Sequence, residues 1–288
     1  MNGTVLQVQN LTISYGNHIA VDDISFDVQD GDLLGIVGPN GSGKTTTFRA
    51  ILGLQPYGGK ISMFGYGPDK FKSLIPLVGY VPQKIIFEPN FPATVHDIVS
   101  MGIIHEKKIT KGMDLLKQNN CYLNRVQNTN GATTLDDTPN TVGPDCKNRT
   151  RSCTGCTTPD DALKTVDLEH LRDRRIGELS AGEQQRVFIA QSLIKNPLMM
   201  ILDEPVTSAD VESQTKFYSI MKKLSESGIT IVWSSHDLDA IERYASRVAC
   251  MNRKLFFHGK KEQFFSDEKL LKTYTESAMQ VHMHRHGH

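Results

Sequence analysis

The N-terminal part of the chain alternates between hydrophobic and polar positions, as half-buried β-strands do. The segments LQVQNLTISY (residues 6–15) and IAVDDISFDV (residues 19–28) follow this period, and Gly16-Asn17 between them is typical of a hairpin turn. A continuous hydrophobic run over residues 33–38 predicts a strand that is buried on both faces. Residues 45–53 have helical spacing and end at a glycine. The chain therefore opens with an antiparallel strand pair, followed by a strand–loop–helix unit.

Further along the chain, helical and strand patterns alternate. A helical region is expected from Thr94 to Lys117, with a threonine suited to cap its first turn, and another helix is expected from Asp160. Hydrophobic runs at residues 198–202 and 230–235 predict two buried strands, each preceded by a helical segment. This alternation predicts an α/β fold, in which a parallel sheet carries helices on its faces.

Residues 119–158 differ from the rest of the chain in composition. They are rich in Asn, Thr, Gly and Asp and contain few large apolar side chains, so they predict a loop or a disordered insert. Four of the five cysteines lie in this insert: Cys121, Cys146, Cys153 and Cys156. The Cys-Thr-Gly-Cys pair has the spacing of half a structural zinc site, and the alternative is a disordered insert with incidental cysteines. Cys250, in the run SRVACM, is instead expected in a buried strand.

The C-terminal tail contains histidines at alternating positions, namely His282, His284, His286 and His288. Several imidazoles at this spacing can bind one ion, and imidazole favours zinc, nickel or copper over manganese. The alternative is a solvated tail without a function. The sequence leaves both interpretations open.

The composition argues against several classes of protein. Lys plus Arg and Asp plus Glu both total 32, so the formal net charge is +0, which argues against nucleic acid as the main partner. The apolar runs are far shorter than the roughly 18 residues that a membrane span requires. The N-terminus has neither the basic start nor the apolar core of a secretory signal. We therefore expect a cytosolic chain that reaches a membrane only through a partner.

The strongest chemical signal is GPNGSGKT, which lies between a predicted buried strand and a predicted helix. This is the phosphate-loop pattern in its usual context, because glycines let backbone N–H groups approach phosphate oxygens and the helix N-terminus adds positive potential. Lys44 is expected to contact the β- and γ-phosphates, and the Thr45 hydroxyl is expected to bind Mg²⁺. The predicted loop contacts to a nucleoside triphosphate are Gly38, Pro39, Asn40, Gly41, Ser42, Gly43, Lys44, Thr45 and Thr46.

Two carboxylates follow the hydrophobic run at residues 198–202. Asp203 and Glu204 lie at the carboxyl end of that predicted strand, where open α/β sheets bind their ligands. Asp203 suits a Mg²⁺-associated carboxylate, directly or through water, and Glu204 suits a general base that polarises the attacking water. Alone, such a pair is typical of a helix cap or a turn. Together with the phosphate loop, it predicts a complete phosphoryl-transfer site.

The segment LSAGEQQR, residues 179–186, resembles the signature motif of ATP-binding-cassette (ABC) ATPases. Ala181 stands where the family pattern has a second glycine, and Glu183 stands where it has glutamine. Ser180 followed by Glu183 is also a capping box, which is compatible with the family's use of this helix N-terminus. The resemblance covers most of the chain and implies a P-loop NTPase, RecA-like parallel-sheet core with an N-terminal antiparallel strand region and a helical signature subdomain.

Four other positions match motifs of the ABC family. By this resemblance, Tyr15 stacks on adenine and Asp210 crosses a dimer interface. Gln83, in GYVPQ, matches the glutamine that senses Mg²⁺ and the attacking water, and His236 matches the histidine that contacts the γ-phosphate. The implied catalytic residues are Glu204, His236 and Gln83; the implied Mg²⁺ residues are Thr45, Gln83 and Asp203; the implied ATP contacts outside the phosphate loop are Tyr15, Ser180, Gly182, Glu183 and Asp210.

The resemblance also implies a domain plan and partners. Residues 1–255 would form the ATPase domain, its helical subdomain would span about 90–185 and contain the polar insert, and residues 256–288 would form a C-terminal extension. One signature per chain implies a homodimer with two ATP molecules between the protomers. The transport pathway would belong to integral membrane permease subunits, with a separate solute-binding protein. The chain would then lie at the cytoplasmic face of the membrane.

Residues 79–102 are similar to the corresponding segment in ATPase subunits of zinc and manganese uptake systems. The segment after Gln83 is too apolar for an ordinary exposed loop and is expected to contact the permease; its apolar residues are Ile85, Ile86, Phe87 and Phe91. One alternative cargo is another small solute, such as a phosphonate or an organic nutrient. A second alternative is a cytosolic ABC protein of translation or DNA repair, although such proteins usually carry two cassettes or a long coiled coil, and neither is visible here.

Overall fold

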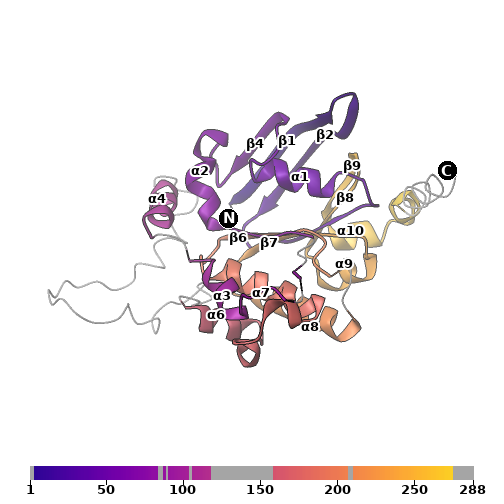
Figure 1. Ribbon diagram of the computed structural model, residues 1–288. Helices are drawn as coiled ribbons and strands as arrows, with labels where there is room; N and C mark the ends of the chain where they lie inside the picture. Colours follow the sequence, from indigo (N-terminus) through magenta and orange to yellow (C-terminus); the bar gives the residue numbers. More distant parts are fainter. Residues whose placement is uncertain are drawn as a thin grey trace.

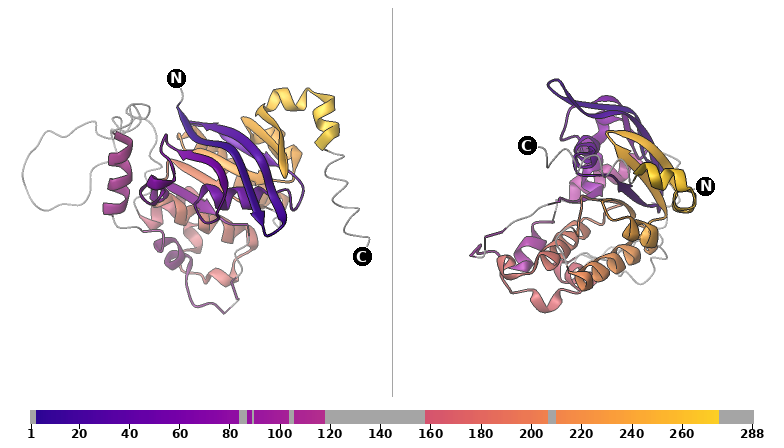
Figure 2. Two further views of the ribbon diagram at one scale, coloured as in Figure 1. Left: turned by 90° about the horizontal axis from the view of Figure 1, so that it is seen from above. Right: turned by 90° about the vertical axis from the view of Figure 1, so that its right-hand side faces the viewer.

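The molecule has two β-sheets with helices between and below them. In the computed structural model, the described residues are 3–83, 87–88, 90–103, 106–117, 158–206 and 210–274. A six-stranded sheet has the order β5-β6-β7-β3-β8-β9, and a three-stranded sheet has the order β2-β1-β4. Figure 1 shows the three-stranded sheet and α1 above the larger sheet, and α3, α6, α7 and α8 below it. The right-hand view of Figure 2 shows the same separation edge-on, with the indigo strands and the salmon helices on opposite sides.

The elements follow the predicted order along the chain. The strands are β1 (Thr4–Tyr15), β2 (His18–Gln29), β3 (Leu33–Val37), β4 (Gly58–Met63), β5 (Val78–Val81), β6 (Met199–Leu202), β7 (Thr230–Ser235), β8 (Arg247–Asn252) and β9 (Lys254–Lys260). The α-helices are α1 (Lys44–Ile51), α2 (Phe71–Leu74), α3 (Val95–Ser100), α4 (Glu106–Lys117), α6 (Pro159–Thr165), α7 (Ala181–Leu193), α8 (Val211–Glu226), α9 (Leu238–Tyr244) and α10 (Lys261–Phe265). Short 3₁₀ turns are η1 (Pro68–Lys70), η2 (Ile75–Leu77), η5 (Glu169–Leu171) and η6 (Ile176–Glu178).

The central strands are hydrophobic throughout because both faces of the large sheet are covered. In β3, Leu33 and Val37 belong to the core below the sheet, and Leu34 and Ile36 belong to the core above it. Strands β5, β6, β7, β3 and β8 are mutually parallel. The predicted α/β fold with a parallel sheet and an antiparallel N-terminal sheet is therefore confirmed. The buried strand around Cys250 is confirmed as well, since that thiol is fully buried in β8.

The helix starts agree closely with the sequence. Thr94 caps α3, where its hydroxyl accepts a hydrogen bond from the backbone N–H of Asp97 and the Asp97 carboxylate accepts one from the backbone N–H of Thr94. The helix expected from Asp160 begins one residue earlier, at Pro159, because the Thr158 side chain caps it. Helix α4, also expected in the helical subdomain, packs instead against α2 and η2 beside the antiparallel sheet.

The sheet extends beyond the expected domain boundary at residue 255. That residue lies inside β9, which pairs antiparallel with β8 from Asn252↔Lys254 to Arg247↔Lys260. After α10, residues 268–274 form a further helical segment, and Phe264 and Tyr274 are buried in the core below the sheet. None of the helices in the described ranges is long and apolar enough to cross a membrane.

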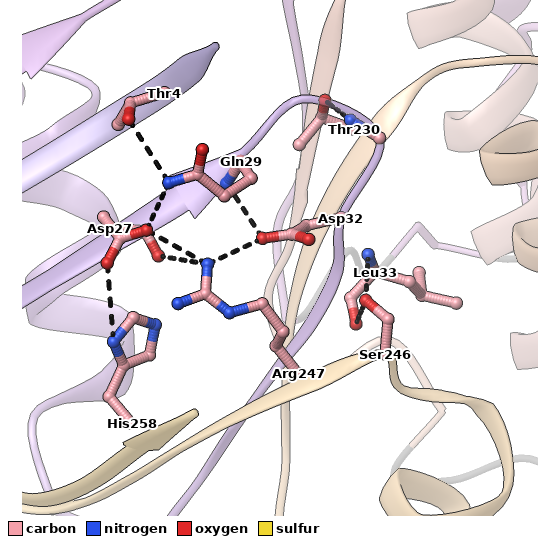
Figure 3. Close-up of polar contacts among 10 residues, drawn as sticks. Thr4, Asp27, Gln29, Asp32, Leu33, Thr230, Ser246, Arg247 and His258 are labelled. Atoms are coloured by element: carbon pink, nitrogen blue, oxygen red, sulfur yellow. Dashed lines mark hydrogen bonds and ion pairs between the residues drawn. The ribbon is translucent and has the colours of Figure 1, made fainter. Parts of the chain in front are cut away.

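A half-buried polar cluster joins the antiparallel sheet to the large one (Figure 3). Nη1 of Arg247 in β8 lies 3.0 Å from Asp27 Oδ2 at the end of β2 and 2.9 Å from Asp32 Oδ2 before β3. His258 Nδ1 in β9 lies 3.7 Å from Asp27 Oδ1. Burial raises the pKa of Asp27, but hydrogen bonds from Arg247 and Gln29 outweigh it and hold that pKa below its usual value. Asp27 is therefore ionised at neutral pH, and its ion pair with Arg247 connects the two sheets.

Candidate active site

The phosphate loop connects β3 to α1 and is held in a conformation that requires glycine. Gly41 and Gly43 have φ angles of 81° and 98°, in the left-handed region. A Cβ on Gly43 would lie 2.7 Å from the carbonyl oxygen of Ala20 in β2. A side chain at this position would therefore push the loop away from β2 and from the start of α1. The loop residues from Asn40 to Thr46 line a cavity that also touches β1 and β2.

Lys44 is buried at the centre of this loop. Its Nζ donates hydrogen bonds to the carbonyl oxygens of Gly38 at 2.7 Å and Pro39 at 3.1 Å, and it lies 3.1 Å from Glu204 Oε1. The ammonium is thus fixed within the cavity beside the N-terminus of α1, where backbone N–H groups add positive potential. This arrangement suits the binding of a polyphosphate.

Asp203 and Glu204 follow β6 and meet the phosphate loop, as predicted. Ser234, in the neighbouring strand β7, donates a hydrogen bond from Oγ to Asp203 Oδ1 at 2.9 Å and accepts one from the backbone N–H of Glu204 at 2.8 Å. One hydroxyl therefore orients both acidic residues. The sequence pattern did not single out Ser234, although it precedes His236 by two residues in the same SSHD segment.

The residues predicted to hold Mg²⁺ fit that ion. Asp203 is fully buried, and its Oδ2 has no partner of hydrogen-bonding geometry among the described residues. Burial raises the pKa of Asp203, and the hydroxyls of Thr45 and Ser234 partly oppose that increase. A buried carboxylate oxygen next to a threonine hydroxyl is the kind of hard oxygen site that Mg²⁺ prefers. A bound cation would favour the ionised carboxylate.

Glu204 is held in an unusual backbone conformation. Its φ angle is 42°, in the left-handed region that is uncommon for a residue with a side chain. Its Oε1 faces Lys44, and its Oε2 accepts a hydrogen bond from Gln83 Nε2 at 2.5 Å. Gln83 comes from the loop after β5, so three segments distant in sequence converge on this carboxylate. This convergence agrees with a catalytic role for Glu204.

Two cavities share the Glu204 side chain. The first is lined by Tyr15, His18, Ala20, Asn40, Gly41, Ser42, Gly43, Lys44, Thr45, Thr46, Gln83 and Glu204. The second is lined by Glu204, Pro205, Val206, Gln214, Tyr218, Ser234, Ser235, His236 and Asp237. Tyr15 and Gln83, which were predicted from the sequence, thus line the cavity of the phosphate loop. His236, also predicted, lines the second cavity.

Four predicted ATP contacts line neither cavity. Ser180, Gly182 and Glu183 lie at the start of α7, where Ser180 and Glu183 form the expected capping box. Burial raises the pKa of Glu183, but hydrogen bonds from Ser180 hold it below its usual value. Asp210 caps α8 by accepting a hydrogen bond from the backbone N–H of Ser213 at 2.9 Å. Within one protomer, Ser180, Glu183 and Asp210 cap helices, and Gly182 is buried in the first turn of α7.

The predicted zinc ligands fall outside the described residues. These ligands are Cys121, Cys146, Cys153, Cys156, His282, His284, His286 and His288. In the ranges that the structure describes, three or more His, Cys, Asp or Glu side chains nowhere gather as a metal site would require.

Comparison with known proteins gives consistent matches. The family model described as "ABC transporter" matches residues 21–207. The manganese transport system ATP-binding protein MntB of Halalkalibacterium halodurans is 32% identical over 271 residues, which cover 94% of this chain and 92% of the relative. The zinc uptake system ATP-binding protein ZurA of Listeria innocua is 32% identical over 263 residues, which cover 90% of this chain and 87% of the relative.

Solved structures share the fold. A nucleotide-free ATP-binding cassette of an ABC transporter superposes with a TM-score of 0.69 at 23% identity, over 94% of this chain and 99% of that one. The ADP conformation of MJ1267, an ATP-binding cassette of an ABC transporter, gives a TM-score of 0.68 at 22% identity, over 95% of this chain and 99% of that one. These likenesses show that the chain shares the fold of these cassettes.

Proposed function

Because the chain belongs to the ABC transporter family, we propose that it is the ATP-hydrolysing subunit that powers uptake of a divalent metal ion, zinc or manganese, across a membrane. The observation that carries this proposal is the convergence of Lys44, Glu204 and Gln83 on one cavity. Asp203 is buried next to the Thr45 hydroxyl, which lines the same cavity. The cargo is inferred from the relatives, which are the ATP-binding proteins of a manganese transport system and of a zinc uptake system.

We propose a role in hydrolysis for the polar residues at the centre of this cavity and for Asp203 beside it. Lys44 and the loop N–H groups bind the β- and γ-phosphates. Thr45 and Asp203 would hold Mg²⁺, which neutralises phosphate charge when bound. Glu204, oriented by Gln83 and Ser234, accepts a proton from the attacking water.

The second cavity contains His236, the remaining residue for which a catalytic role is expected. His236 lines it, directly between Ser235 at the end of β7 and Asp237, which caps α9. We infer that this imidazole donates to the γ-phosphate when the site closes, which completes the set of residues that Glu204 and Gln83 begin.

The proposed partners are inferred from the predicted ATP contacts that do not line the ATP cavity of their own protomer. We infer a homodimer in which the α7 N-terminus of one protomer, with Ser180 and Gly182, completes the ATP site of the other, and in which Asp210 lies at the interface. Ser180 is exposed at a helix N-terminus, where backbone N–H groups attract an anion. The dimer would bind integral membrane permease subunits, with a separate solute-binding protein, at the cytoplasmic face of a membrane.

The expected permease contact is only partly exposed in the protomer. Phe87 stacks on Phe188 of α7 with ring centroids 5.9 Å apart, so it packs against the core instead of projecting outward. Phe91, packed on Phe87, is 38% exposed. Nearby at the end of α3, Met101 and Ile103 are exposed large apolar residues. We propose that Phe91, Met101 and Ile103 contact the permease; Ile85 and Ile86 lie outside the described residues.

Metal uptake by cells that carry the Glu204→Gln chain tests the proposed cargo. Accumulation of radioactive zinc and manganese is measured under metal limitation, beside cells with the unchanged chain and with Glu212→Gln, an exposed carboxylate on α8. Uptake of one of the two ions should fall to background only in the Glu204→Gln cells. Co-purification in detergent should recover a multi-span membrane protein. Unchanged uptake of both ions would favour another small solute, and absence of a membrane partner would favour a cytosolic ABC protein.

We further propose that Zn²⁺ binds the cysteines of the polar insert. The Cys153-Cys156 pair has the spacing of half a zinc site, and the insert has few apolar groups around which to fold. Metal analysis of a chain that ends at residue 274 excludes the tail histidines but keeps Tyr274, which is buried. One zinc per chain, lost in Cys153→Ser, is expected. A zinc content near zero before mutation would contradict the proposal.

A further inference from the structure

The second cavity contains a buried phenol hydroxyl that the proposed mechanism does not use. Tyr218 in α8 is 4% exposed and lines this cavity together with Glu204 and His236. Its Oη atom is buried and has no partner of hydrogen-bonding geometry among the residues that the structure describes. Buried polar groups of native proteins nearly always have such a partner, so this hydroxyl points to a small polar ligand in the cavity.

The hydroxyl of Tyr218 has a fixed position at the wall of the cavity. Tyr244 of α9 stacks on its ring with centroids 4.6 Å apart and an interplanar angle of 12°, and Phe217 contacts it edge-on at 5.6 Å. Burial raises the pKa of Tyr218, the negative charge of Asp237 raises it further, and the nearby Ser235 hydroxyl opposes the increase. Asp237 and Ser235 both line the cavity, so the phenol faces it. The phenol stays protonated at neutral pH and is a hydrogen-bond donor.

We propose that the second cavity binds an ordered water molecule, which accepts a hydrogen bond from the Tyr218 hydroxyl and donates to the carboxylates of Glu204 and Asp237. The cavity volume is about 70 Å³, against the roughly 10–15 Å³ that one water needs, so it admits water but no nucleotide. The two carboxylates that line it would repel inorganic phosphate or another anion, whereas a water can donate to both.

This water would connect three segments that are distant in sequence. Tyr218 lies in α8, Glu204 follows β6, and Asp237 caps α9. A carboxylate has about four acceptor sites, so Glu204 can accept from water in addition to its contacts with Lys44 and Gln83. Tyr218 is therefore a positioning residue that acts on Glu204 through the water. This inference rests on the role in hydrolysis that is proposed above for Glu204.

A crystal structure of the full chain, at a resolution that shows ordered surface waters, tests the binding of water. Density for a water should lie within hydrogen-bonding distance of Tyr218 Oη and of a carboxylate oxygen of Glu204 or Asp237. In Tyr218→Phe, which keeps the stacked ring, this density should disappear or move. A cavity without density, or with an anion in it, would overturn the proposal.

Single-turnover ATP hydrolysis tests the positioning role. Tyr218→Phe should be about three- to tenfold slower, the size of one lost hydrogen bond. ATP affinity, measured by titration calorimetry in the Glu204→Gln background, should stay within about twofold, because Tyr218 does not line the cavity of the phosphate loop. Tyr244→Phe is the matched control: it removes the hydroxyl from the other ring of the stack, which lines neither cavity, and should hydrolyse ATP within about twofold of the unchanged chain.

An unchanged hydrolysis rate in Tyr218→Phe would overturn the positioning role, and so would a parallel loss of ATP affinity, which would indicate a distorted site. A rise in melting temperature would also count against the water, because removal of a buried hydroxyl stabilises a protein only if that hydroxyl had no partner. Glu204→Gln is assayed alongside. If it also hydrolyses ATP normally, the proposed role of Glu204 is wrong; if only Tyr218→Phe does, the inference about Tyr218 alone is wrong.

Discussion

Replacement of Glu204 by glutamine is expected to slow ATP hydrolysis at least about 100-fold while leaving ATP binding intact. Loss of a general base costs on the order of 10²–10⁴ in rate. Glutamine has the same shape as glutamate, and Asp203 is untouched. Its amide oxygen can accept from Lys44, and its NH₂ group can donate to the Gln83 amide oxygen once the Gln83 amide turns over. Single-turnover hydrolysis with radiolabelled ATP measures the rate, and sizing chromatography should show a dimer trapped by ATP.

Glu212→Gln provides the control for this experiment. Glu212 lies in α8 and pairs on the surface with Lys216, so removing its charge should leave hydrolysis within about twofold. If Glu204→Gln hydrolysed ATP at the unchanged rate in a single turnover, the assignment of Glu204 as the base would be wrong.

Replacement of Ser180 by arginine is expected to abolish ATP-driven dimerisation. In the proposed dimer, this position faces the γ-phosphate on the other protomer, so a long side chain would separate the two protomers. The protomer's own phosphate loop is unaffected, because Ser180 does not line the cavity that contains Lys44. Nucleotide binding to the monomer should persist, while sizing chromatography with ATP in the Glu204→Gln background should show no dimer.

Ser180→Ala separates the interface effect from the loss of a helix cap. Both substitutions remove the hydroxyl that accepts from the Glu183 N–H, which costs about 1 kcal/mol of helix stability. Only arginine adds bulk and charge. Ser180→Ala should therefore lower the melting temperature as Ser180→Arg does, yet still form dimers with ATP. Dimerisation of Ser180→Arg at normal ATP concentrations would count against an ATP site completed by the partner protomer.

Features that arise from local patterns were predicted well from the sequence. The uninterrupted hydrophobic run of β3 indicated burial on both faces, and the structure shows why: successive residues belong to the cores above and below the sheet. The phosphate loop was recognisable because its glycines and Lys44 occur between a strand and a helix. The N-cap at Thr94 and the capping box at Ser180 were equally local.

Features that depend on contacts between distant segments could not be predicted from local sequence patterns. The hydrogen bond from Ser234 to Asp203 joins residues 31 positions apart in adjacent parallel strands. Nothing in the local pattern around Ser234 distinguishes it from other strand residues. The left-handed backbone at Glu204 is similarly invisible in sequence, because a glutamate gives no indication of positive φ.

The expected boundary at residue 255 shows how a missing turn signal misleads. Strands β8 and β9 are joined through Arg253, which adopts a φ of 59° without being a glycine. Hairpin turns of this kind usually carry Gly, Asn or Asp at such positions, and Asn252 alone did not mark a turn. Residues 256–260 were assigned to the C-terminal extension, although their backbone continues the sheet as the larger part of β9.

Strand β9 also covers the edge of β8, which could otherwise pair with a strand of another molecule. It is the antiparallel edge strand of the large sheet and covers the backbone N–H and C=O groups of β8 along its whole length. A chain cut at residue 255 would leave that row of groups open, together with the apolar surface that Phe257 and Phe264 now cover. An unpaired hydrophobic edge is a template for strand pairing with a second molecule. The C-terminal hairpin thus protects the sheet against aggregation, independently of any role in nucleotide chemistry.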